Sequence, residues 1–245
     1  MNSIVKLVYR WNRGSLATPD FFCTPFVVTA EELLFMSMVL KSTSTSGAWA
    51  PNSMTNSGTT LDWTVSGGVT IAKTTIDVPT FDFSGNTGVA DILVENTDDL
   101  TSMVASSLDI SSVTFENTTA FTFINLNDNN LTSLEISNSP NLITLLIGDN
   151  NISSLGIYNT PLLSSMRVDN NNLPTLDILP ITLLSSLTCQ GNNFSATVTN
   201  KVLSDLVTNG INNGNLSYRN NETGQGVTDR ATLVTRGWTI NNFVT

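Results

Sequence analysis

Residues 142–152 read LITLLIGDNNI, and the apolar spacing of this stretch returns along the chain every 21 residues. Aligned stretches begin at residues 100, 121, 163 and 184, so apolar side chains fall into columns. Three columns are Leu100, Phe121, Leu142, Leu163, Leu184; Met103, Ile124, Leu145, Met166, Leu187; and Ala105, Leu126, Ile147, Val168, Cys189. Three more are Ile110, Leu131, Ile152, Leu173, Phe194; Val113, Leu134, Leu155, Leu176; and Phe115, Ile136, Ile157, Ile178. A fixed period of this length predicts a repeat architecture.

Each repeat carries two short LxI-type patterns, one in each half. Alternate side chains of a strand point to opposite faces, so each pattern places two side chains inward and its middle residue outward. One such coil cannot bury its apolar edge alone, but coils stacked at roughly 4.8 Å form two parallel ribbons around one continuous core. The pattern therefore predicts a mainly β stack.

The stretch Leu142–Ile152 resembles the LxxLxLxxNxL signature of leucine-rich-repeat proteins. The 21-residue form with a second LxI is similar to internalins and to surface leucine-rich proteins of Bacteroidetes bacteria. The resemblance covers about residues 91–194 and implies a leucine-rich-repeat solenoid of about five coils. It implies little about a ligand, because a fold does not determine a function.

A column of asparagines accompanies the apolar columns: Asn129, Asn150, Asn171 and Asn192, with Leu108 in the first coil. An asparagine amide donates twice and accepts twice, so it can bridge one coil to the next where the chain turns. We expect a structural ladder. A calcium loop at residues 127–130 (NDNN) is the alternative, although it lacks the glycine and spaced glutamate of such loops. Cys189 lies in a core column and is expected to be an inert small hydrophobe.

Both ends of the repeats are expected to be capped. Residues 61–90 are rich in short strand patterns and predict a β-rich cap. Residues 195–245 predict a small α/β cap, with a helix before Gly210, a strand at 216–218, a helix over 228–236 and a last strand at 238–240. Residues 46–60 are rich in Ser, Thr and Asn and predict a linker.

Residues 1–45 are predicted to be a docking or anchoring segment. The pattern Thr29-Ala-Glu-Glu32 matches a capping box before an apolar run. That run predicts a buried assembly helix formed by Leu33, Leu34, Phe35, Met36, Met38, Val39 and Leu40. Packing of this helix against the β cap is the alternative. Residues 1–11 resemble a strand more than a secretory signal, so the chain either never used a signal or has lost it.

Composition excludes several classes of function. The 245 residues include no histidine and only two cysteines, and the net charge of the chain is −10. Histidine-based catalytic triads are therefore impossible, and an acidic balance disfavours nucleic acid. No apolar run approaches the ~20 residues of a membrane span. No nucleophile, base or phosphate loop stands out. We therefore expect that the chain is not an enzyme and that it binds neither a metal nor a cofactor.

The charge excess lies on the repeats, since residues 90–194 hold eleven acids and one base, Arg167. This acidic surface either steers basic partners toward the chain or is a solvated surface that keeps neighbours apart. On the first ribbon, Phe123, Asn125, Leu146, Arg167 and Asp169 are expected to face outward as a small binding face for a protein or glycan. The alternatives are that these positions are merely tolerated or that a neighbouring subunit covers them.

Residues 224–240 (GQGVTDRATLVTRGWTI) resemble a closing segment of tailed-bacteriophage structural proteins. The two resemblances together imply a non-enzymatic virion protein of the tail, fibre or capsid surface, exposed and host-binding. Its partners would be other virion proteins or copies of itself, and a host surface protein or glycan. The alternative is a bacterial cell-surface leucine-rich-repeat adhesin.

Overall fold

A computed structural model describes most of the chain. The described residues are 6–10, 24–28, 38–46, 48–56, 61–65, 70–73, 80–95, 97, 99–115 and 119–243. The chain divides into two compact units, Met1–Phe35 and Met36–Thr245. In the first unit, β1 (Lys6–Arg10) and β2 (Thr24–Val28) pair as antiparallel strands.

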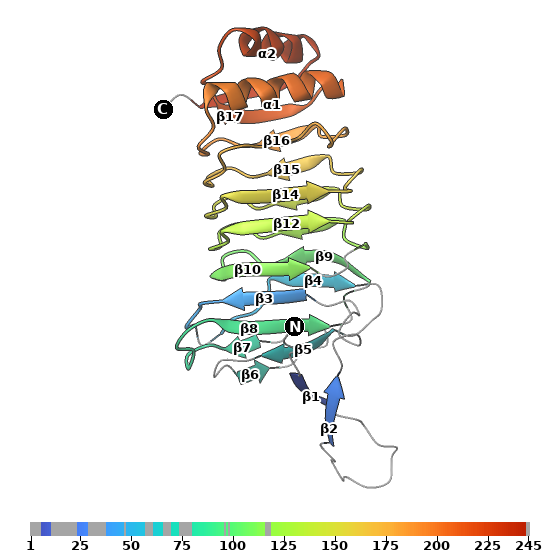
Figure 1. The fold of residues 1–245 in the computed structure, drawn as a ribbon, viewed down its shortest axis with the longest axis vertical. Coiled ribbons are helices and arrows are strands. Elements are labelled where there is room, and N and C mark those ends of the chain that lie inside the picture. Colours follow the sequence, from blue (N-terminus) through green and yellow to red (C-terminus); the bar gives the residue numbers. More distant parts are fainter. Residues whose placement is uncertain are drawn as a thin grey trace, which may run out of the picture. The chain divides into compact units, whose positions relative to one another are not determined.

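The second unit is mainly β (Figure 1), and it contains the two helices of the described chain. Its largest sheet, called the long sheet here, has eight strands in the order β18-β17-β16-β15-β13-β11-β9-β4. These strands are β4 (Ser53–Asn56), β9 (Leu100–Val104), β11 (Phe123–Asn125), β13 (Thr144–Leu146), β15 (Ser165–Arg167), β16 (Ser186–Thr188), β17 (Asn215–Arg219) and β18 (Thr239–Phe243). All neighbours in the long sheet are parallel except β4, which runs antiparallel to β9.

The register of the long sheet follows the 21-residue period. Phe123 of β11 is paired with Thr144 of β13, Thr144 with Ser165 of β15, and Ser165 with Ser186 of β16. The middle residue of each of these strands is fully buried, and its neighbours are partly exposed. The inward columns Leu100–Leu184, Met103–Leu187 and Ala105–Cys189 all lie in one core.

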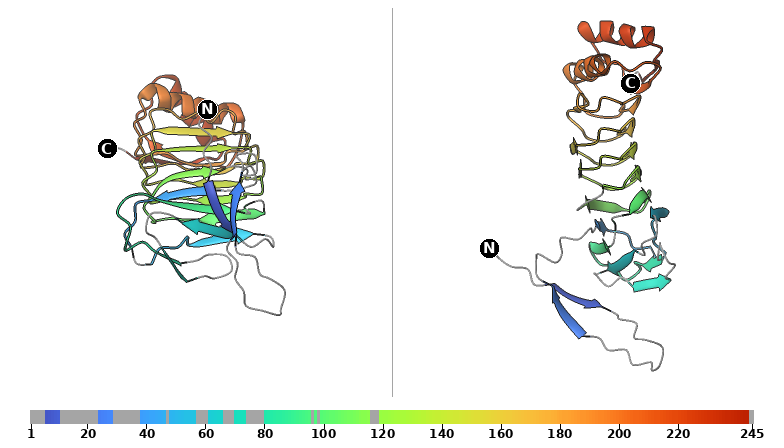
Figure 2. Two further views of the ribbon diagram at one scale, coloured as in Figure 1. Left: turned by 60° about the horizontal axis from the view of Figure 1, so that its bottom comes forward. Right: turned by 90° about the vertical axis from the view of Figure 1, so that its right-hand side faces the viewer.

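A second, shorter ladder lies on the other side of the stack (Figure 2). It consists of β12 (Ser133–Ser137) and β14 (Ser154–Tyr158), which are parallel and in register over five residues. Leu134 and Ile136 point into the core from β12. The two ladders therefore face each other across the same apolar columns, as two strand patterns per repeat predict.

At the N-terminal end the ladders are continued by antiparallel strands. A four-stranded sheet has the order β10-β3-β8-β5, with β10 (Ile110–Phe115), β3 (Met38–Ser42), β8 (Ala90–Glu95) and β5 (Asp62–Val65). A hairpin pairs β6 (Thr70–Lys73) with β7 (Thr80–Asp82). Trp49, Phe81 and Phe83 pack their rings together and are buried in this cap.

Two expectations for residues 1–60 are wrong. Met38, Val39 and Leu40 do not form a helix: they belong to β3, which lies between β8 and β10. A short apolar run suits a central strand as well as a buried helix, and here the strand has neighbours on both sides. Residues 33–36 of the expected helix lie outside the described residues. The expected linker contains β4 and the buried Trp49, so part of it belongs to the core.

The C-terminal cap replaces the second ladder by helices. α1 (Ala196–Asn209) begins after Ser195, whose side chain accepts from the Val198 amide, and ends at Gly210 with φ 77°. α2 (Gln225–Thr235) connects β17 to β18. A glycine such as Gly210 adopts the left-handed conformation without strain, which explains why α1 ends where the sequence predicts. The helices cover the end of the stack (Figure 1).

Candidate functional site

The register of the long sheet brings three of the expected binding-face residues into one row. Asn125, Leu146 and Arg167 are Cα partners on β11, β13 and β15. Phe123 lies two residues before Asn125, so it is on the same outer face. All four side chains are partly exposed. The inward residues between them, Ile124, Leu145 and Met166, are buried and hold the row in place.

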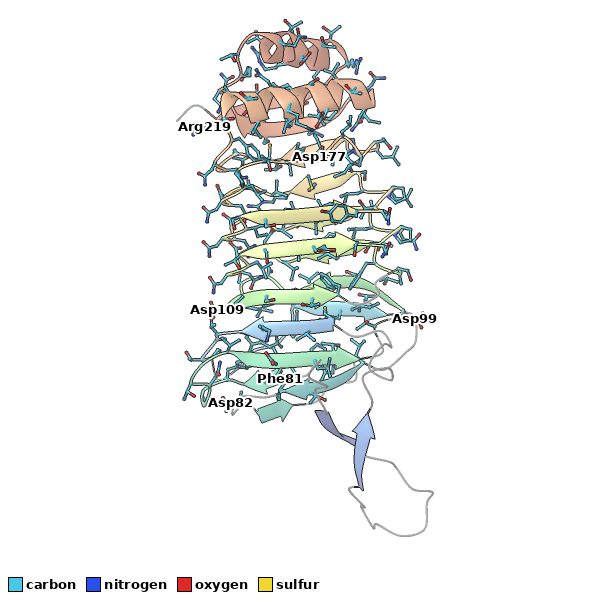
Figure 3. All side chains as sticks on the ribbon, in the orientation of Figure 1. Phe81, Asp82, Asp99, Asp109, Asp177 and Arg219 are labelled. Carbon is cyan, nitrogen blue, oxygen red and sulfur yellow. The ribbon has the colours of Figure 1, made fainter. Side chains whose placement is uncertain are left out.

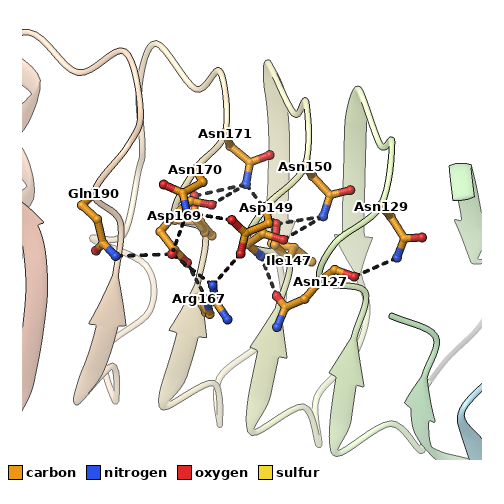
Figure 4. Close-up of polar contacts among 12 residues, drawn as sticks. Asn127, Asn129, Ile147, Asp149, Asn150, Arg167, Asp169, Asn170, Asn171 and Gln190 are labelled. Carbon is orange, nitrogen blue, oxygen red and sulfur yellow. Dashed lines mark hydrogen bonds and ion pairs between the residues drawn. The ribbon is translucent and has the colours of Figure 1, made fainter. Parts of the chain in front are cut away.

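Arg167 is not a free cation on this face. Its Nε lies 2.6 Å from Oδ1 of Asp169, and its Nη2 lies 2.6 Å from Oδ2 of Asp149 on the preceding turn (Figure 4). The hydrogen bond with Asp169 raises the pKa of the guanidinium above its ordinary value. The only base of residues 90–194 is therefore engaged by two carboxylates, and the face presents little positive charge.

Asp169 corrects the expected binding face, because it is 3% exposed. Besides Arg167, its Oδ2 accepts from Gln190 Nε2 at 3.3 Å and from Asn170 Nδ2 at 3.4 Å. Asn170 also donates to Oδ1 of Asp149 at 2.7 Å. Asp169 is thus the centre of a polar cluster that spans three successive turns, rather than a contact residue.

Gly148 makes room for this cluster. A Cβ at residue 148 would lie 2.6 Å from Asp169 Oδ1 and 2.8 Å from Arg167 Nε. The sequence offers a signal that could have revealed the cluster: Asn127, Gly148, Asp169 and Gln190 form one column, and the glycine precedes the acid and the base by one turn. The pairing of Asp149 with Arg167 was not predicted, because a local sequence pattern does not compare charges that are 18 residues apart.

The asparagine column makes the bridging hydrogen bonds expected of a ladder. Asn150 Nδ2 donates to Leu126 O of the previous turn and to Ile147 O and Gly148 O of its own turn, while its Oδ1 accepts from Leu131 N. Asn129, Asn171 and Asn192 repeat this arrangement. Each side chain is buried, so both ends of each amide are satisfied by backbone groups at the corner.

Two side-chain oxygens of the possible calcium loop are used internally. Asn127 Oδ1 accepts from Gly148 N at 2.7 Å, and Asn129 Oδ1 accepts from Leu108 N and Ile110 N. In the described part of the chain, no three His, Cys, Asp or Glu side chains are grouped so that they could hold a metal ion. The geometry at residues 127–130 therefore favours the structural alternative.

Cys189 lies in the core between β16 and the asparagine corner. It is free and 2% exposed. Burial raises the pKa of its thiol to about 12, with a further contribution from the charge of Asp169. A thiol with this pKa stays protonated near neutral pH, which disfavours a role as a nucleophile.

Comparisons of the chain with models of known families, with curated proteins and with solved structures find no match. Over the residues that the structure describes, neither helix has the length and apolar character needed to cross a bilayer.

Proposed function

We propose that the chain is a leucine-rich-repeat solenoid that acts by binding rather than by catalysis. The resemblance of Leu142–Ile152 to the leucine-rich-repeat signature is supported by parallel strands in 21-residue register. It is further supported by the asparagines, whose amides join each turn to the one before.

The observation that carries a binding function is the row Asn125, Leu146 and Arg167, with Phe123 beside it. These side chains stand on short strands whose middle residues are fully buried, so their spacing is set by the ladder. An aromatic and an aliphatic side chain that are partly exposed on a rigid sheet can form a small contact site at a reduced ordering cost. A host surface protein or glycan is the proposed ligand of this row.

We propose further that this binding takes place on a bacteriophage virion. The support is the resemblance of residues 224–240 to the closing segment of tailed-phage structural proteins. In this chain the segment contains α2 and part of β18, and β18 is the edge strand of the long sheet. Other virion proteins or further copies of the chain would be its structural partners. A bacterial surface adhesin is the second candidate, favoured by the resemblance to Bacteroidetes surface proteins.

Host binding is tested with the full chain, fluorescently labelled and added to Bacteroidetes cells. The Phe123→Ser/Leu146→Ser variant should lose most of the cell-bound signal. A matched control, Leu162→Ser/Leu183→Ser, removes two leucines that are each 44% exposed elsewhere, and it should bind as the parent does. Equal binding of both variants would remove the row from consideration, provided that circular dichroism shows both folded.

Arg167, the third member of the row, is left unchanged in this variant. The change Arg167→Ser would leave the buried carboxylate of Asp169 without its cation, so a loss of binding could reflect a loss of folding. Virion membership needs a separate test: mass spectrometry of purified particles should contain peptides of this chain. Peptides found only in the bacterial envelope would favour the adhesin.

A further inference from the structure

The short ladder stops after β14, although the sequence repeat continues. Within the continuously described stretch 119–243, no backbone hydrogen bond connects residues 154–158 to residues 175–179, and Leu176 and Ile178 lie outside any strand. The long sheet continues without a break through β15 and β16. The edge of β14 that faces the next turn is therefore left without a ladder partner.

Two prolines explain this opening. Ser153 N donates to Thr132 O of the previous turn at 2.9 Å, but the residue 21 positions after Ser153 is Pro174, which has no N–H. At the following corner, Asn138 and Asn159 have φ of 54° and 53°. The next residue of that column is Pro180, whose ring holds φ near −65°. The turn after β14 can neither make the ladder bond nor follow the same corner.

The opening exposes apolar side chains and creates a pocket. Leu155 and Ile157 of β14 are only partly buried, whereas the corresponding residues of β12, Leu134 and Ile136, are buried. A pocket of about 300 Å³ lies here. It lies between Leu155, Ile157 and Tyr158 of β14 and Leu176 and Asp177 of the next turn. This volume is at the lower limit of ligand pockets, so it suits one long side chain better than a large ligand.

The pocket is lined by an aromatic ring and one carboxylate, and a second carboxylate lies on the neighbouring strand β12. Tyr158 is 59% exposed, and its ring lies over Gly156, since a Cβ there would be 2.8 Å from Tyr158 Cε2. Glu135 is the register partner of Gly156 on β12 and is exposed. Among the described residues Glu135 makes no hydrogen bond or ion pair. Asp177 lines the pocket, and its side chain is 68% exposed. It lies near α1 in the stack (Figure 3), and one of its oxygens is 2.9 Å from Lys201 Nζ.

We propose that this pocket binds the lysine or arginine side chain of an extended partner polypeptide. The leucine and isoleucine side chains would contact the methylene stem, the carboxylates of Glu135 and Asp177 would hold the cationic head, and the Tyr158 ring would add a cation–π contact. The inference does not rest on the proposed host-binding row, because it concerns the other ladder.

Charge favours a cationic occupant over a neutral one. Residues 90–194 hold eleven acids, and their single base is engaged by Asp149 and Asp169. At the pocket itself Asp177 already contacts Lys201, so the exposed carboxylate of Glu135 is the one free to attract a basic partner. An acidic segment would be repelled from the same pocket.

The test uses three blocked pentapeptides that favour an extended conformation: Val-Thr-X-Thr-Val with X as lysine, norleucine or glutamate. Each is titrated into the full chain and followed by NMR of the isoleucine and leucine methyl groups. The lysine peptide should give saturable shifts at Leu155 and Ile157, at least tenfold tighter than the norleucine peptide, and weaker at high salt. The glutamate peptide should give none.

Variants locate the binding and separate charge from folding. Glu135→Gln and Tyr158→Ser should each weaken the lysine peptide several-fold. The matched control Asp128→Asn removes an exposed carboxylate at the other corner and should change little. Equal binding of lysine and norleucine peptides, absence of saturable shifts, or equal losses in Glu135→Gln and Asp128→Asn would each overturn the proposal. Host-cell binding by the parent chain would be unaffected by any of these outcomes.

Discussion

Asn150 donates from Nδ2 to the carbonyl oxygen of Leu126, which is 24 residues earlier in the chain and 3.0 Å away. The oxygen of the same amide accepts from Leu131 N, so one side chain closes the corners of two successive turns. Asn129, Asn171 and Asn192 occupy the same place in their own turns. These four amides are buried, which makes the ladder sensitive to the loss of any one of them.

Replacement of Asn150 by alanine should lower the free energy of unfolding by about 1–3 kcal/mol, because it leaves buried backbone groups without partners. Asn151→Ala is the matched control, since Asn151 is exposed, and it should change stability by less than about 0.5 kcal/mol. Urea denaturation of both variants provides the measurement. A parent-like midpoint for Asn150→Ala would show that the amides do not hold the turns together.

Leu145→Ala should destabilise the chain by about 2–5 kcal/mol, because Leu145 is fully buried in the middle of β13 and its truncation leaves a cavity. Leu162→Ala removes the same atoms from a side chain that is 44% exposed. Thermal unfolding should rank the two variants clearly. Similar losses for both would contradict the assignment of Leu145 to a continuous core.

Gly148→Ala should destabilise the chain by about 1–3 kcal/mol, because the new methyl group would collide with the paired side chains of Arg167 and Asp169. Gly88→Ala places a methyl group in open space and should be nearly neutral. The comparison is made by chemical denaturation at low and high salt. If Gly148→Ala were as stable as Gly88→Ala, the polar cluster would not be closely packed in solution.

Removal of residues 1–35 should leave a cooperatively folding chain, since the second compact unit begins at Met36. Removal of residues 1–45 should not, because it deletes β3 and leaves the facing edges of β8 and β10 unpaired. Circular dichroism melts of the two truncations provide the test. The variant that lacks residues 1–35 can then be tested for incorporation into particles, which measures any anchoring role of these residues without loss of the core.

Cys189 should resist iodoacetamide at pH 8 in the native state. Its pKa of about 12 leaves almost no thiolate, and the side chain is buried. Alkylation should become rapid in denaturant, where the pKa returns to its ordinary value. The experiment uses a Cys23→Ser background so that only one thiol reports. Fast native labelling would mean that the core column around Cys189 opens readily.

The inward columns and the asparagine ladder could be predicted from the sequence, because both depend on a period that repeats at every turn. Leu145 and Asn150 have counterparts 21 residues before and after them, so four or five copies of one environment identify it. The helix ends at Ser195 and Gly210 were also predictable, since capping depends on local backbone geometry.

Only the tertiary structure decided the features that depend on neighbours distant in sequence. Met38–Leu40 is a strand because β8 and β10 pair with it on both sides, whereas the apolar run alone suits a helix equally well. The charge of Arg167 is paired because stacking brings Asp149 of the previous turn to it. Pro174 and Pro180 can be seen in the sequence. Their effect depends on the tertiary structure, because the turn that contains them lies beside β14 but makes no ladder hydrogen bonds to it. The period and the local backbone geometry can be predicted from neighbouring residues. The energy of strand and ion pairing depends on contacts between turns that are distant in sequence.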